Sequence, residues 1–120
     1  IQQGAVVVTD DTLHPEYAYS TYAFRQSVIA EHPEAIGGFL AAIEQAVDAI
    51  NLDPTAWDTL LTEQNLVPAP LIGSYKIPIF PVASVPTKAQ WTDTAAWALE
   101  TGLVNTNIAY SDSVTDEFLP

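Results

Sequence analysis

Two histidines are the first candidates for chemistry in this chain. His14 and His32 each stand directly before a proline, and an imidazole can act as a general base or bind a metal ion. No Gly-x-Ser-x-Gly, His-Glu-x-x-His or glycine-rich phosphate motif accompanies them. A residue before proline avoids the helical region, so both are expected in exposed turns. We predict no catalytic residue, no metal site and no cofactor, and we expect the chain not to be an enzyme.

The carboxylates do not have the spacing of a cation site. Asp10, Asp11, Asp112, Asp116 and Glu117 lack the alternating pattern and central glycine of an EF-hand loop. The chain has 15 acidic and three basic residues, a formal net charge of −12, so these carboxylates are interpreted as solvated. Without clustered basic residues, binding to nucleic acid or to an anionic membrane surface is not expected. The absence of cysteine excludes disulfides and thiolate chemistry.

Residues 17–24 combine aromatic rings with hydroxyl groups. A pocket for a small organic molecule needs apolar walls and a few polar groups that fix the ligand's orientation. The candidate ligand-binding or hinge residues are Tyr19, Ser20, Thr21 and Tyr22. The alternative is a buried strand with tyrosine hydroxyls at its rim, and the residues alone favour that structural interpretation.

Two short strands and several helices are expected to position these residues. Residues 4–9 are mostly β-branched and residues 17–24 are aromatic, which favours strands. A short helix is predicted at residues 25–31. A longer helix is predicted from Pro33, and its apolar residues form one stripe: Ile36, Phe39, Leu40, Ile43, Val47 and Ile50. The pair Gly37-Gly38 inside this helix predicts a close contact with another element, because each glycine weakens a helix.

The second half of the chain has clear helix boundaries. Asp53 followed by Pro54 predicts the start of a helix that ends near residue 65. Thr87 and Gln90 have the spacing of a capping box, and Gly102 suits the position after the end of that helix. A last short helix is expected at residues 112–118. Residues 66–86 contain five of the nine prolines among apolar residues, so we expect them to lie extended across a surface.

Length and composition set further bounds. The chain has 120 residues, 48% of them hydrophobic, which suits one domain with a core. No uninterrupted run of about 18 apolar residues occurs, so no membrane span is predicted. The chain contains no methionine, even at position 1, and we interpret it as a piece of a longer protein.

The order of these features resembles one known family. Residues 22–35 (Tyr-Ala-Phe-Arg-Gln-Ser-Val-Ile-Ala-Glu-His-Pro-Glu-Ala) are similar to a segment of ABC-importer solute-binding proteins, in the group that takes up thiamine precursors, taurine, alkanesulfonates and nitrate. The family's next helix opens with Asn-x-Asp/Asn-Pro, which residues 51–54 match. Residues 90–104 resemble its terminal helix with a Gly-Leu stop, and residues 114–119 resemble its Val-Asp-x-x-Phe-Leu ending.

The resemblance implies a fold and a location. The fold class would be mainly α with a short N-terminal β element, the C-terminal part of a type II periplasmic binding protein with two α/β lobes. Residues 1–24 would be a late strand of the second lobe and the crossover strand, and residues 25–120 a helical part packing on the first lobe. The protein would be periplasmic or extracellular and membrane-anchored.

The resemblance also implies binding partners, and it leaves alternatives open. A small solute and the permease of an ABC transporter would be the partners, with a thiamine-related pyrimidine favoured because the chain has few cations for an anion. The alternative is a free-standing helical protein-interaction module acting through residues 66–86. A third hypothesis is that the protein is an enzyme, but no motif supports it. The isolated chain is expected to expose apolar faces and to form a homodimer or swapped oligomer.

Overall fold

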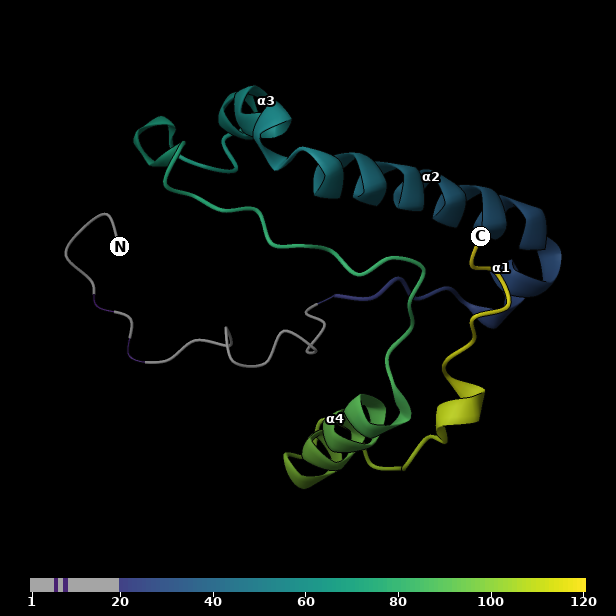
Figure 1. Ribbon diagram of the computed structural model, residues 1–120. Coiled ribbons are helices and arrows are strands. Elements are labelled where there is room, and N and C mark those ends of the chain that lie inside the picture. Colours follow the sequence, from purple (N-terminus) through teal and green to yellow (C-terminus); the bar gives the residue numbers. More distant parts are fainter. Residues whose placement is uncertain (1–5, 7, 9–19) are drawn as a thin grey trace. The chain divides into compact units, whose positions relative to one another are not determined.

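A computed structural model describes Val6, Val8 and residues 20–120 of the chain (Figure 1). Two compact units share these residues. One unit contains Phe24–Ser84 and Asp116–Pro120, and the other contains Val85–Thr115 with the described residues before Phe24. The regular elements, in chain order, are α1 (Gln26–Glu31), α2 (Pro33–Leu52), η1 (Pro54–Trp57), α3 (Asp58–Glu63), η2 (Ala69–Leu71), α4 (Lys88–Glu100) and η3 (Tyr110–Asp112).

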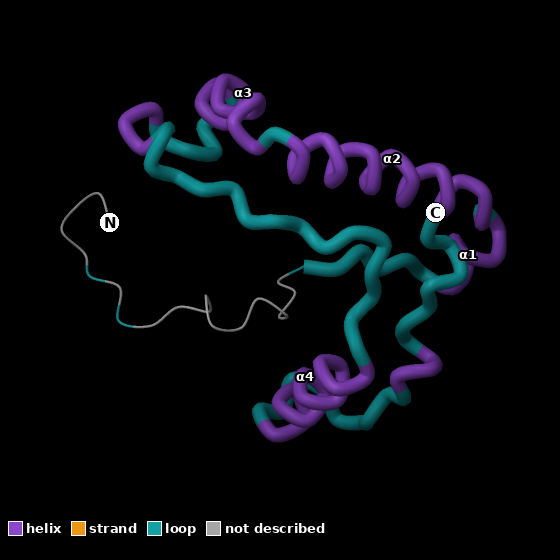
Figure 2. The backbone as a smooth tube through the Cα atoms, viewed as in Figure 1, coloured by secondary structure: helices purple, strands orange, loops and turns teal. Residues whose placement is uncertain are grey.

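The predicted fold class is wrong. The described residues form neither a strand nor a sheet (Figure 2), so they show no N-terminal β element and no α/β lobe. Val6 and Val8 are 82% and 95% exposed, and residues 20–24 have no regular structure. A strand needs a neighbouring strand for its backbone hydrogen bonds, and this part of the chain offers none. The rest of both predicted strands, residues 4, 5, 7, 9 and 17–19, lies outside the described residues.

The first two helices begin where the sequence predicts. α1 ends just before His32, and Pro33 occupies the first position of α2, where a missing N–H costs no helix hydrogen bond. The stripe of α2 is only partly covered: Ile36 is 3% exposed, while Phe39 is 42% exposed. The ring of Phe24 packs edge-on against Phe39, with centroids 5.9 Å apart.

The predicted close contact at the glycine pair of α2 is wrong for the described residues. A Cβ added at Gly37 or Gly38 would meet nothing within 4 Å. Glycine costs about 1 kcal/mol relative to alanine inside a helix. In the described part of this unit, no packing contact offsets that cost.

The predicted helix after residue 53 is two short elements. The carboxylate of Asp53 accepts hydrogen bonds from the N–H and the hydroxyl of Thr55, at 3.1 and 2.7 Å, and so caps η1. α3 follows and ends in a turn where Asn65 has a φ of +55°. The N–H groups of Leu66 and Val67 both donate to the carbonyl of Leu61, and Val67 is 5% exposed.

The segment after α3 is predicted to lie extended, but its first part, residues 69–74, forms a helical turn and a further turn. η2 is its one helical turn, and residues 75–87 have no regular structure. Four large apolar residues between positions 66 and 82 have about half or more of their surface exposed: Leu66 (69%), Tyr75 (49%), Ile79 (87%) and Val82 (54%).

The capping box of α4 is confirmed. The N–H of Gln90 donates to the Thr87 hydroxyl at 3.2 Å, and the N–H of Thr87 donates to the Gln90 side chain at 2.7 Å. α4 ends before Gly102, which has a φ of +72° and lets the chain turn back.

The predicted helix at residues 112–118 is wrong. The structure has the single turn η3 there and no helix in residues 113–120. Residues 111–116 (Ser-Asp-Ser-Val-Thr-Asp) have low helix propensity. A helix this short also gains too few hydrogen bonds to offset its nucleation cost.

Few side chains are buried. Among the described residues, Ile36 and Val67 are the buried hydrophobic ones, although a chain of this length can bury about two-thirds of its surface. The described part of the chain therefore presents apolar faces to solvent, as the sequence predicts.

Candidate functional site

The predicted ligand-binding residues lie partly within the described chain. Ser20, Thr21 and Tyr22 are exposed, Tyr22 by 59%, and Tyr19 lies outside the described residues. The exposed residues present hydroxyls and an aromatic ring to solvent, and none of them lines the two hollows described next. Their role as ligand-binding or hinge residues stays a prediction.

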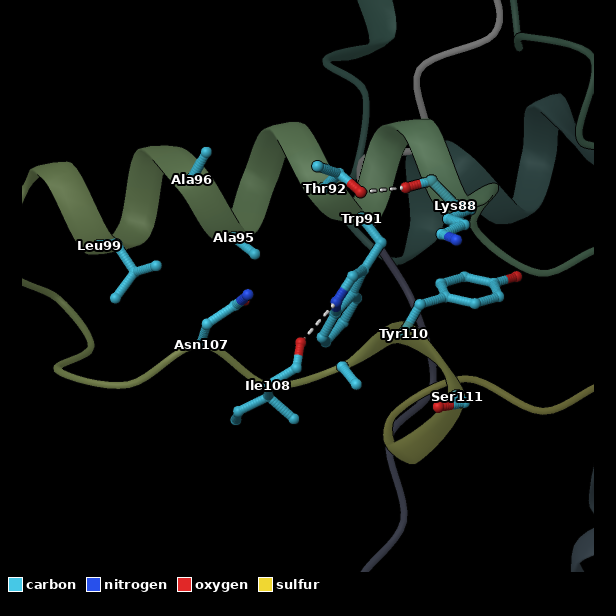
Figure 3. A pocket seen from close by; sticks show the side chains of 11 residues that line it. Lys88, Trp91, Thr92, Ala95, Ala96, Leu99, Asn107, Ile108, Tyr110 and Ser111 are labelled. Atoms are coloured by element: carbon cyan, nitrogen blue, oxygen red, sulfur yellow. Dashed lines mark hydrogen bonds between the residues drawn. The ribbon is translucent and has the colours of Figure 1, made fainter.

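A hollow with polar and apolar residues in its lining lies along α4 (Figure 3). Its volume is about 420 Å³, within the range of small-molecule sites. Trp91 crosses its middle, with Lys88 and Tyr110 at one end and Leu99 at the other (Figure 3). The chain returning after α4, residues 107–111, forms the opposite wall. A smaller apolar hollow of about 150 Å³ shares Trp91 with it.

Hydrogen bonds fix the walls of this groove. The indole N–H of Trp91 donates to the carbonyl of Ile108 at 3.2 Å. The hydroxyl of Tyr110 donates to the carbonyl of Pro86 at 2.9 Å. Both side chains therefore join α4 and its preceding residues to the returning chain.

The polar groups left for a ligand are few. The Thr92 hydroxyl is already bonded to the carbonyl of Lys88 at 2.7 Å, and the Ser111 hydroxyl is 3.2 Å from the Asp112 carboxylate. Lys88 and Asn107 supply an ammonium and an amide to the same lining, whose other residues are mostly apolar. This arrangement can orient a small organic molecule, and it places no nucleophile beside a base.

The other titratable candidates are exposed. His32 lies at the junction of α1 and α2, 4.0 Å from the Glu31 carboxylate, with 65% of its side chain in solvent, which confirms its prediction as an exposed turn residue. Asp112, Asp116 and Glu117 are exposed as well. His14, Asp10 and Asp11 lie outside the described residues. The described residues contain no group of three His, Cys, Asp or Glu side chains suited to a metal ion.

Two polar side chains of α2 form hydrogen bonds with the backbone of a distant segment. The Asn51 amide donates to the carbonyl of Phe80 at 2.8 Å and accepts from the Phe80 N–H at 3.0 Å. The Glu44 carboxylate accepts from the N–H of Ala83 at 2.9 Å. The sequence predicts an extended segment here but not these contacts, because they join residues 29 and 39 positions apart. The signal that the sequence offers for these contacts is the spacing of Glu44 and Asn51, two polar residues seven positions apart on a largely apolar helix.

α2 is also long and apolar enough to span a membrane. It has 20 residues and a mean hydropathy of 1.2, although Glu34, Glu44 and Asp48 interrupt its apolar residues. The absence of a membrane span stays a prediction. Glu44 and Asp48 would be costly inside a bilayer. The core helix of a soluble protein passes the same test, so this property assigns no location.

Comparisons with family models, with curated proteins and with solved structures find no match to this chain.

Proposed function

We propose that this chain is part of the extracytoplasmic solute-binding component of an ABC importer. The observation that carries the proposal is the order of motifs at residues 22–35, 51–54 and 90–119. Three helix boundaries coincide with these motifs: α2 starts at Pro33, Asp53 caps η1, and Gly102 follows α4. Each of these motifs therefore contains a residue at the boundary of a helical element.

The exposed apolar surface supports the proposal that this chain packs against other protein segments. Leu52, Ile79 and Leu66 are 88%, 87% and 69% exposed, and apolar surface of this kind marks an interaction site or an element's missing neighbour. In the proposed receptor, other segments of the same protein or the permease would cover these side chains. The chain itself would contribute binding and no chemistry.

The charge of the chain bears on the solute. With a net charge of −12, the chain repels anions, and anion sites favour arginine or helix N-termini. Of the residues that line the groove along α4, Lys88 is the cation. A neutral or cationic heterocycle such as a thiamine-related pyrimidine fits this balance better than a sulfonate or nitrate. Ser20, Thr21 and Tyr22 would offer it hydroxyls and a ring.

Fluorescence titration of the whole encoded protein with four solutes tests the proposal. The solutes are a thiamine-related pyrimidine, taurine, an alkanesulfonate and nitrate. Tyr22→Ala should weaken pyrimidine binding about tenfold or more, while Tyr75→Ala is the control, because Tyr75 is a similarly exposed tyrosine (49%) in the other unit. Equal effects of the two variants would contradict the role of Tyr22 in binding. The absence of a fluorescence change with every solute would contradict the proposed solute-binding function.

A helical protein-interaction module is the second candidate. The observation that favours it is the exposure of Ile79 and Val82, 87% and 54%, in an irregular segment. This function predicts no solute binding but a saturable complex with one purified protein. Ile79→Asp should weaken that complex without changing the helix content measured by circular dichroism.

A further inference from the structure

Residues 76–84, here called the strap, lie against α2 without regular structure and with a bend at Val82 and Ala83 (Figure 1). Two helix residues hold the strap by its backbone. Asn51 pairs with both polar backbone groups of Phe80, and Glu44 accepts from the N–H of Ala83. These four residues are called the clasp.

The two halves of the clasp have matching spacing. Glu44 and Asn51 are seven residues apart, which on a helix is about 10.5 Å and nearly the same face. Phe80 and Ala83 are three residues apart, and three residues of chain span at most about 10 Å. Because the higher strap number pairs with the lower helix number, the strap runs antiparallel to α2. Both attachment points are occupied at once, and the strap bends at Val82 and Ala83, next to the second point.

The strap is held by hydrogen bonds more than by apolar burial. Of residues 76–84, only Ile77 is partly buried, and Ile79 is 87% exposed. Within the described residues, the hydrogen bonds of the strap are the three bonds of the clasp. Each contributes little net stability in contact with water, so the strap has a weak hold.

Backbone strain at one end of the strap favours opening. Ala83 has a φ of +41°, a left-handed conformation that costs energy for a residue with a Cβ. Its N–H is the group that Glu44 holds. When that bond breaks, Ala83 can return to a negative φ, and the strain is released.

We propose that the strap is a releasable cover on α2, which opens as a unit when the clasp breaks while α2 stays helical. Opening uncovers the helix face between Glu44 and Asn51. Val47 lies on that face, one turn from each, and is partly buried in the closed form. This inference does not rest on the proposed function.

Hydrogen exchange of single amides, measured by NMR on the intact protein, tests this cover. In the wild type, the amides of Phe80 and Ala83 should be protected, should exchange at one common rate, and should exchange faster than the amides in the middle of α2. Asn51→Ala should accelerate both strap amides about three- to tenfold, without accelerating those of α2. An acceleration confined to Phe80 would show that the two halves open separately and would overturn the proposal.

Matched variants distinguish the loss of the clasp hydrogen bonds from a general loss of stability. Glu44→Gln keeps an oxygen acceptor for Ala83 and should change exchange less than Glu44→Ala. Gln45→Ala alters an exposed neighbour and should change nothing. The wild-type measurement stands even where a variant fails to fold. Strap amides that exchange as in an unfolded chain, or only together with those of α2, would overturn the proposal.

Discussion

The side-chain amide of Asn51 pairs with both backbone polar groups of Phe80, at 2.8 and 3.0 Å, across 29 residues of sequence. An amide that donates and accepts at one residue imitates the pairing between neighbouring strands. The helix thereby supplies, from one side chain, hydrogen bonds that an extended segment obtains elsewhere from a sheet. This relationship explains how residues 76–84 are held against α2 where the described chain has no strand.

Replacing Trp91 by phenylalanine should weaken the groove along α4. The change removes the hydrogen bond to the Ile108 carbonyl and part of the ring that joins α4 to the returning chain. The free energy of unfolding should fall by about 1–3 kcal/mol. Trp97→Phe is the control, because Trp97 is on the same helix and 57% exposed. Urea unfolding followed by circular dichroism would measure both, and equal losses would contradict the role given to Trp91.

Thr87→Ala should destabilise α4 by about 1 kcal/mol, because it removes the acceptor for the Gln90 N–H. Thr92→Ala is the matched control. The Thr92 hydroxyl bonds to the carbonyl one turn back, an interaction that does not stabilise a helix, and alanine has the higher helix propensity. Thermal unfolding should therefore rank Thr87→Ala below the wild type and Thr92→Ala at or above it.

The hydrogen bond from the Thr55 side chain, and those from backbone N–H groups, lower the pKa of Asp53. A carboxylate whose pKa is lower when folded stabilises the fold above its unfolded value, near 4. That contribution disappears as pH falls through the lower, folded-state pKa. Asp53→Asn caps equally well at pH 7 and should lose less stability than the wild type as the pH falls below about 4.

An NMR titration of the Asp53 carboxyl carbon is the direct measurement. A midpoint at or above the ordinary value for aspartate would contradict the capping role.

Gly37→Ala should stabilise α2 by about 1 kcal/mol, because alanine is the better helix former and the added Cβ meets nothing within 4 Å. Gly38→Ala should do the same for the same reason. Thermal unfolding of the chain measures both. A loss of stability in either variant would show that another element packs against the glycine pair, as the sequence suggests.

Local signals in the sequence predicted helix boundaries well. Thr87 with Gln90, Asp53 with Pro54 and Pro33 each mark a boundary that the structure has. These signals act within four residues, so the neighbouring sequence contains all the information that they need. The order of the helices follows from them.

Features that depend on distant partners were not predictable in this way. The strand predictions took β propensity at residues 20–24 as sufficient, although a strand forms only where another strand pairs with it. The clasp was missed for the related reason that Asn51 and Phe80 are far apart in sequence. Of the candidate site, the sequence predicted Ser20, Thr21 and Tyr22 as ligand-binding or hinge residues, which stays a prediction. It did not predict the groove that Trp91 and Ile108 build.

Calorimetric titration of the whole encoded protein with a thiamine-related pyrimidine tests the central claim most directly. A solute-binding component predicts saturable binding of one pyrimidine per protein, with taurine, an alkanesulfonate and nitrate binding more weakly or not at all. The absence of heat with all four solutes, together with a saturable complex with a partner protein through residues 66–86, would contradict it and favour the interaction module.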